Sequence, residues 1–201
     1  MFEYRKGGKI GMDILLCERL DDAVVAYIVN KWSQTSKEPL GRIIIQKVCY
    51  FLKSKGIPLD YSFDMYHYGP YSQDLHFRMD DLVADGIVND KSTKAAKSNY
   101  MPGKNNSQMI NMFSEELTDI KESIDSVIDM LSEFDTSTLE LLSTVHYFQT
   151  SYTNFYGREP HKDYVMGKVK EAKKEKFSDV VISAAYDALK KAGLFEWKSA
   201  A

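Results

Sequence analysis

A histidine, a serine and an aspartate, the residue types of a hydrolytic triad, lie close together in one short segment of the chain. His67, Ser72 and Asp74 fall within eight positions of each other. A catalytic triad is defined by its geometry, and three polar residues around a turn are common by chance. Ser72 is also well placed to cap a helix, because its hydroxyl can accept a hydrogen bond from a free backbone amide. We therefore expect a turn and a helix start here, and no catalytic residue.

Metal and cofactor chemistry are not predicted either. The chain has four histidines, and His67 and His76 lie nine positions apart across a turn with no cysteine nearby. A metal site needs three or four converging ligands, usually paired at short and fixed spacing. The chain also lacks a phosphate-binding glycine loop and a dinucleotide fingerprint. The sequence predicts no metal, no cofactor and no enzymatic activity, and an enzyme stays an alternative only because His67 lies between aromatic residues.

Aromatic residues alternate with other residues around His67, and they are the best candidates for a contact surface. In extended chain, a period of two directs Tyr61 and Phe63 to one side and Tyr66 and Tyr68 to the other. Tyrosine joins an apolar ring to a polar hydroxyl and is favoured at protein interfaces. An alternative in which the rings only wedge this segment onto the core stays open. The predicted partner-binding residues are Tyr66, His67, Tyr68, Tyr71 and Arg78.

Hydrophobic periodicity predicts mainly helical chain around this segment. Apolar residues recur every three or four positions over 19–32 and again between Pro39 and Gly56. Two prolines and Gly69 make 57–71 an extended segment that ends in a turn. Ser72 then caps a helix that ends at Gly86. A short strand at 87–88 and a polar loop or β-wing over 89–108 should follow.

This order of elements is that of a winged helix-turn-helix, with the helix 72–86 as its recognition helix. The predicted fold class is mainly α, a winged-helix-like helical domain or pair of domains with a short β-wing. We expect a flexible lead-in over 1–18, a winged-helix-like module over 19–110 and a helical C-terminal module over 111–201. The two modules should share one core.

The second half of the chain is also predicted to be helical. Ser114 should cap a helix whose apolar stripe, from Leu117 to Phe134, packs against one neighbouring helix. Asp135 restarts a helix, and the segment 152–161 should be a loop. A further helix lies around 165–169, and Ser178 caps a last helix that ends at Gly193. The last helix resembles 72–86, which suggests a second helix-turn-helix-like unit, although any capped helix that ends at glycine has this pattern.

The charges are distributed unevenly, although the net charge is only -3. Residues 114–140 contain nine carboxylates and a single lysine, and an acidic surface of this kind could meet a basic protein such as a toxin. Helix 72–86 has Arg78 alone against four aspartates, a balance that repels DNA. The alternative is therefore a winged-helix DNA-binding regulator that contacts DNA through the basic C-terminal unit. The nucleic-acid residues of that alternative are Lys170, Lys173, Lys174, Lys176 and Lys190.

Composition indicates a soluble protein of the reducing cytoplasm with no membrane partner. The longest apolar run, Ile43-Ile44-Ile45, is far too short to span a bilayer, and no segment has the pattern of a signal peptide. Cys17 and Cys49 lie far apart and do not form a disulfide framework. We expect each of them to be a small core residue rather than a reactive thiol. The oligomeric state is left open.

One ordered set of motifs carries a family resemblance over residues 40–88, with a weaker likeness over 139–195. The set consists of the segment 46–52 (QKVCYFL), the segment 56–59 (GIPL) and the segment 63–72 (FDMYHYGPYS). It resembles the SocA-like antitoxin family, also called the Panacea domain, and is even more similar to the YwgA-type bacterial and archaeal proteins. The resemblance implies a helical protein that neutralises toxins or acts as an adaptor through protein contact, and it supplies no catalytic residues. Many members of the Panacea family have a tryptophan before the turn, where this chain has Tyr66 and His67.

Overall fold

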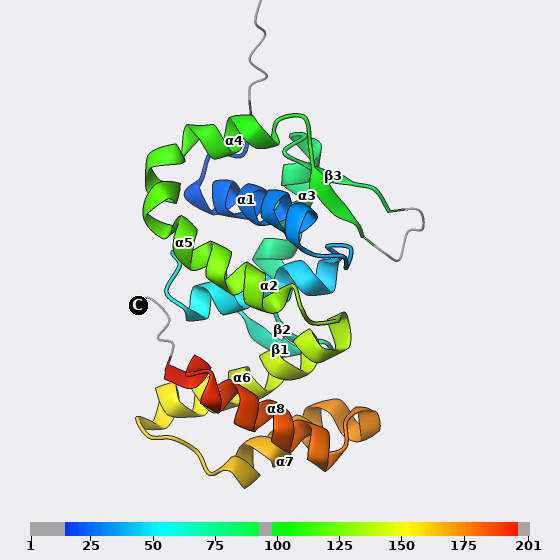
Figure 1. The fold of residues 1–201 in the computed structure, drawn as a ribbon, viewed down its shortest axis with the longest axis vertical. Helices are drawn as coiled ribbons and strands as arrows, with labels where there is room; N and C mark the ends of the chain where they lie inside the picture. The colour runs from blue at the N-terminus through cyan, green and yellow to red at the C-terminus, as the bar shows by residue number, and fades with distance from the viewer. Residues whose placement is uncertain (1–14, 93–97, 197–201) are drawn as a thin grey trace, which may run out of the picture.

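The computed structural model describes residues 15–92 and 98–196, which are mainly helical with two small antiparallel sheets (Figure 1). No helix within these ranges is long and apolar enough to cross a membrane. The first half of the elements comprises α1 (Leu20–Thr35), α2 (Arg42–Ser54), β1 (Asp64–Tyr66), β2 (Gly69–Tyr71), α3 (Gln73–Ala84), β3 (Val88–Asp90) and β4 (Tyr100–Pro102). The second half comprises α4 (Asn106–Met112), α5 (Ser114–Leu131), α6 (Thr136–Tyr156), α7 (Lys162–Lys173), the 3-10 turn η1 (Lys174–Lys176), α8 (Asp179–Lys191) and the 3-10 turn η2 (Leu194–Glu196).

Helix α1 is the central element of the upper part of the molecule (Figure 1). It contacts α4, α5 and β4, and its residues from Asp21 to Ala26 are all buried. Helix α2 lies beneath α1 and contacts α5, α6 and β2. The stripe of α5 therefore packs against both α1 and α2, and the prediction of a single neighbouring helix was wrong.

The described residues between α3 and α5 contain a hairpin and a helix, where the sequence predicts a polar loop or a β-wing. Strands β3 and β4 form an antiparallel hairpin in which Val88 faces Pro102. The short strand predicted at 87–88 is present but covers Val88–Asp90. Helix α4 begins at Asn106, inside the range predicted to be loop. Ser114 is the first residue of α5 and makes no capping bond, because the N-cap position is taken by Phe113, which follows the end of α4 at Met112. The prediction of Ser114 as a helix cap was wrong.

Helices α6, α7 and α8 form the lower part of the molecule, and α6 links it to the upper part through α2 and β2 (Figure 1). Helix α6 continues to Tyr156, so the loop predicted from residue 152 begins later than expected. The helix ends where Gly157 takes the left-handed conformation with φ of 66°, which favours glycine. The predicted caps at Ser72 and Ser178 are confirmed, since each side chain accepts a bond from the amide three residues later. Asp135, where a helix was predicted to restart, caps α6 in the same way.

One cluster of buried residues extends through the described chain, from Val24 in α1 to Ile182 in α8. Cys17 and Cys49 are both free and buried within it, as expected for core residues. Burial raises the pKa of the Cys17 thiol to about 12. Leu15 is also buried, although it falls within the predicted lead-in, whose residues 1–14 lie outside the described ranges.

Candidate functional site

The turn at residues 66–72, which we call the Tyr-Gly-Pro turn, joins a short hairpin to helix α3. In the hairpin Tyr66 faces Gly69 and Met65 faces Pro70. Gly69 has φ of +89°, and a Cβ atom built on it would lie 2.9 Å from Thr144 Oγ1. Only glycine therefore fits between the hairpin and α6. Ser72 Oγ accepts a hydrogen bond of 3.3 Å from the Leu75 amide, so its hydroxyl caps α3.

Side chains from two distant helices hold the backbone of this turn. Lys47 Nζ donates a 2.6 Å hydrogen bond to the Pro70 carbonyl. Gln46 bonds both backbone groups of Ser72, donating to its carbonyl at 2.9 Å and accepting from its amide at 2.8 Å. Lys173, at the end of α7, donates at 2.7 Å to the His67 carbonyl. Three carbonyl groups of the turn, those of His67, Pro70 and Ser72, thus accept hydrogen bonds from side chains of α2 and α7.

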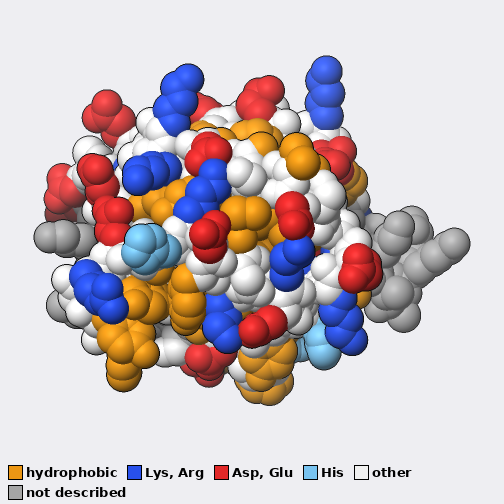
Figure 2. All heavy atoms as spheres, turned by 90° about the horizontal axis from the view of Figure 1, so that it is seen from below, with side chains coloured by type: hydrophobic (Ala, Val, Ile, Leu, Met, Phe, Trp, Pro, Cys, Tyr) orange, Lys and Arg blue, Asp and Glu red, His pale blue; other side chains and the backbone are white. Residues whose placement is uncertain are grey.

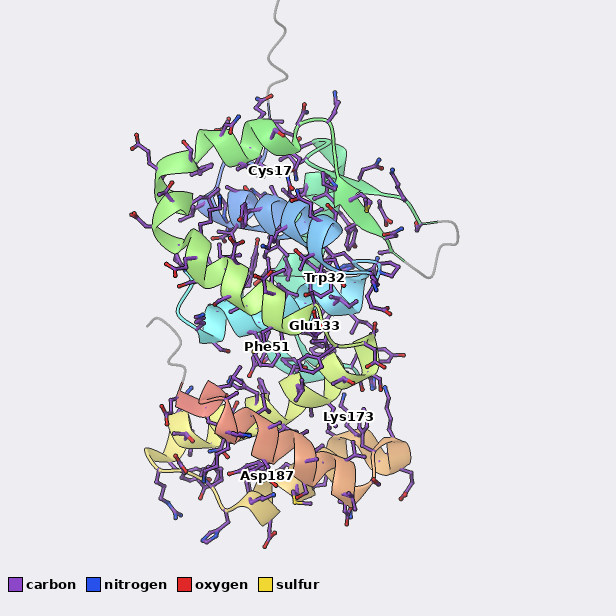
Figure 3. All side chains as sticks on the ribbon, in the orientation of Figure 1. Cys17, Trp32, Phe51, Glu133, Lys173 and Asp187 are labelled. Carbon is purple, nitrogen blue, oxygen red and sulfur yellow. The ribbon has the colours of Figure 1, made fainter. Side chains whose placement is uncertain are left out.

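A buried carboxylate balances the lysines that hold the turn. Glu140 is only 2% exposed. Its Oε2 accepts a 2.7 Å hydrogen bond from Lys176, and its Oε1 forms a 3.0 Å ion pair with Lys173. We call Lys47, Glu140, Lys173 and Lys176 the lysine–glutamate cluster. Lys173 lies where α7 and α8 meet the α6 layer (Figure 3), so the cluster joins the lower part of the molecule to the turn.

Burial strongly affects the charge of Lys47, which is 1% exposed. Burial, aided by the positive charge of Lys173, lowers the pKa of Lys47 to about 7, while Glu140 acts in the opposite direction. Burial also lowers the pKa of Lys173, again against the effect of Glu140. A lysine of lowered pKa can act as a base or a nucleophile. Here the Lys47 amine is bonded to a backbone carbonyl inside the core, and its observed role is to fix the turn.

The outer side of the hairpin carries a continuous series of rings. Tyr66 lies 5.3 Å from Tyr71 between ring centroids, Tyr71 lies 6.2 Å from His76, and His76 lies 5.7 Å from Phe77. We call these four residues the aromatic row. Tyr66 is 53% exposed and Phe77 is 60% exposed, so both ends of the row are open to solvent. The row runs from the hairpin onto the first turns of α3.

The structure separates the residues predicted to bind a partner. Tyr66 and Tyr71 belong to the aromatic row. Tyr68 is exposed but has its ring 5.9 Å from Lys176 Nζ, next to the lysine–glutamate cluster. The His67 side chain is exposed, while its carbonyl faces Lys173. Arg78 donates two bonds of 2.6 Å to the buried Asp22 and so joins α3 to α1.

The lysines of the DNA-binding alternative do not form one free surface. Lys173 is buried, Lys176 is paired with Glu140, and Lys170 forms a 2.6 Å ion pair with Asp179. Lys174 and Lys190 are exposed. On the face at the α7–α8 end, basic and acidic side chains are mixed, and hydrophobic side chains form separate patches between them (Figure 2).

His146 is buried in the lower part of the molecule with both ring nitrogens bonded. Nε2 lies 2.9 Å from the Leu194 carbonyl and must therefore carry the proton, because a carbonyl can only accept. Nδ1 then accepts from the Tyr50 hydroxyl at 2.8 Å. This neutral ring ties η2 at the C-terminal end to α6 and α2. Among the described residues, no group of three or more His, Cys, Asp or Glu side chains is arranged to hold a metal ion.

The buried His146 makes the fold sensitive to acid. Burial lowers the pKa of His146 to about 4, below the ordinary value of 6.5 that applies to the unfolded chain. As the pH falls, His146 is protonated in the unfolded chain before it is protonated in the folded protein. The contribution of the neutral His146 to the free energy of unfolding is therefore complete above pH 6.5 and is lost as the pH falls from 6.5 to 4. At about 1.4 kcal/mol per pKa unit the loss is roughly 3 kcal/mol. Urea unfolding between these pH values should show this loss in the wild type and a smaller one in His146→Gln. His161 is exposed, so His161→Gln serves as the control. An equal loss of stability in the wild type, His146→Gln and His161→Gln would contradict the role of His146.

Sequence reasoning missed several residues of this region. Lys47 falls on the apolar stripe of its helix, and that position was a signal that its side chain is buried. Phe77 lies off the stripe formed by Leu75, Met79 and Leu82, which was a signal that its ring is exposed. Glu140 was counted with the solvated acidic surface of 114–140, and this was wrong because its side chain is buried between two lysines.

Comparison with known proteins gives one informative relative. No family model matches the chain. Over 116 residues the chain is 31% identical to the uncharacterised protein YwgA of Bacillus subtilis (strain 168). The matched region covers 56% of this chain and 68% of YwgA. The chain therefore belongs to the family of YwgA-like proteins.

Proposed function

We propose that the protein is a non-enzymatic protein-binding module and that the aromatic row is its contact surface. The observation that carries the proposal is the continuous series of rings from Tyr66 to Phe77, exposed at both ends. Exposed aromatic side chains that cluster on a surface are typical anchors of protein interfaces.

The way in which the turn is held supports the same function. Binding costs free energy when flexible groups become ordered in the complex. The backbone beneath Tyr66 and Tyr71 is already fixed by Lys47, Gln46 and Lys173. Burial of two lysines costs desolvation free energy, and a turn that serves only folding does not require this cost. A rigid backbone beneath a contact surface accounts for it.

The finer family assignment belongs to the same proposal. The motif resemblance to SocA-like antitoxins favours a toxin or an adaptor client as the partner, in the cytoplasm. The hairpin β3–β4 after α3 favours a winged-helix arrangement. In a winged-helix arrangement α3 would correspond to the recognition helix, and the aromatic row lies at its start.

Recovery of the partner from the source cell tests the proposal. The tagged wild type should retain a protein in stoichiometric amount, and the double variant Tyr66→Ala/Phe77→Ala should lose it. Phe155→Ala is the matched control, because Phe155 is an 81% exposed ring on α6, outside the row. Failure of the wild type to retain a stoichiometric protein, or retention by the double variant, would count against the proposal.

The DNA-binding alternative has less support. Of its five lysines, Lys173 is buried and two others are paired with carboxylates. Exposed positive charge that meets phosphates is the main source of affinity in non-specific DNA binding. A salt-dependent shift of random duplex DNA, lost in Lys174→Ala/Lys190→Ala, would favour the alternative over the protein-binding proposal.

A further inference from the structure

Carboxylates lie beside the rings of the aromatic row. Asp64 faces Tyr71 directly across the hairpin, and residues opposite each other in an antiparallel pair project to the same side. On α3, Asp74 precedes Phe77 by three positions, and Asp80 follows Phe77 by three and His76 by four. Residues three or four positions apart are neighbours on a helix surface. The row is therefore flanked by acidic groups along both the hairpin and the helix.

These three carboxylates are available to a partner. Asp64, Asp74 and Asp80 are exposed, and none forms an ion pair with another described residue. The nearby Arg78 does not neutralise them, because its guanidinium is bonded to the buried Asp22 and lies 3.4 Å from Asp81. Arg42 of α2 acts on Tyr71 as a nearby cation. Arg19 lines a pocket with Phe77 and Asp74, but it is paired with Asp21, and the same pocket is also lined by Asp60 and Asp81.

Resting on the proposed function, we propose that the partner binds the aromatic row with a basic segment that contains arginine or lysine. Cations are attracted to the faces of aromatic rings, with arginine the more frequent partner. Carboxylates beside the rings add attraction for the same cations and repel acidic segments. The row and its three aspartates thus match one chemical class of ligand.

The acidic helix α5 is the competing surface for a basic partner. Two of its carboxylates already have partners. Asp125 accepts a hydrogen bond from the Tyr27 hydroxyl, and Asp125 and Asp129 both form ion pairs with Lys31. Helix α5 contains no aromatic residue and its large hydrophobic residues are buried or half-buried, so it offers no ring to anchor a ligand. Asp119 and Glu122 of α5 are exposed and provide a matched charge control.

The test uses two fluorescein-labelled peptides of equal length and equal tyrosine and glycine content, one rich in arginine and one rich in glutamate. Fluorescence anisotropy is measured with the full chain at low and high salt. The arginine peptide should bind at least about 10-fold more tightly than the glutamate peptide, and salt should weaken its binding. Asp74→Asn/Asp80→Asn should weaken binding about 5-fold or more, whereas Asp119→Asn/Glu122→Gln should leave it unchanged. Circular dichroism checks that each variant is folded.

The outcomes separate this inference from the proposed function. Equal binding of the two peptides, binding of neither, or equal effects of the two charge-removing variants would overturn the basic-segment inference. The proposed function would still stand if Tyr66→Ala/Phe77→Ala released the partner recovered from the cell. If that double variant kept the cellular partner, the proposed function itself would fail, whatever the peptides show.

Discussion

Replacement of Glu140 by glutamine should lower the free energy of unfolding by about 3–5 kcal/mol, the cost of leaving a buried charge without its partner. Glu140 is the carboxylate that faces Lys173 and Lys176, and the Lys173 side chain is 2% exposed. Glutamine keeps the shape of the side chain and removes its charge. The Lys173 ammonium would then keep its bond to the His67 carbonyl but lose its carboxylate partner, and it would oppose the nearby Lys47 more strongly.

Urea unfolding at neutral pH measures this effect, and two further variants make it specific. Glu171→Gln removes a carboxylate from the exposed pair with Lys168 and should cost less than about 1 kcal/mol. Glu140→Gln/Lys173→Met removes both partners of the buried ion pair and should recover part of the stability. A loss in Glu140→Gln no larger than that in Glu171→Gln would show that the cluster does not stabilise the fold.

Replacement of Arg78 by alanine should also destabilise the protein by about 3–5 kcal/mol, because it leaves a buried carboxylate unpaired. Asp22 is fully buried, and Arg78 is its bidentate partner. The hydrogen bond from the Arg19 amide, at 2.8 Å, would remain as the other contact of the Asp22 carboxylate. The contact that joins α3 to α1 would be lost with the guanidinium.

Thermal and urea unfolding of Arg78→Ala should be compared with Arg158→Ala, an exposed arginine 5.8 Å from the Tyr152 ring. The control should change the stability by less than about 1 kcal/mol. Asp22→Leu/Arg78→Leu, which removes both charges, should recover part of the loss. A small effect of Arg78→Ala would mean that the guanidinium is not needed for the fold. The predicted role of Arg78 in partner binding would then explain its position better than a role in the fold.

Local signals in the sequence predict many of the elements that position the site. The caps at Ser72 and Ser178 and the helix ends at Gly86 and Gly193 follow from the physics of helix termini, which involves only neighbouring residues. The exposed position of Tyr66 follows from the alternation of an extended segment. These features need no knowledge of the rest of the chain, and for this reason they could be predicted.

The rest depends on contacts between distant residues. The burial of Glu140 is fixed by lysines of α7 and η1, and nothing near Glu140 in the sequence distinguishes it from the solvated carboxylates of α5. Helix α4 is polar in composition, but Asn106 bonds the Ala26 and Ile87 carbonyls and so fixes the helix start against α1 and the hairpin. Tertiary hydrogen bonds of this kind override local preference.

The dissociation constant of the recovered partner tests the central claim most directly. It should be measured by calorimetry for the wild type, for Tyr66→Ala/Phe77→Ala and for Phe155→Ala. Loss of two anchoring rings should weaken binding by roughly 1,000-fold, since two hot-spot rings at about 2 kcal/mol each amount to about 4 kcal/mol. Phe155→Ala should bind like the wild type. Equal affinity of the wild type and the double variant would contradict the assignment of the aromatic row as the binding surface.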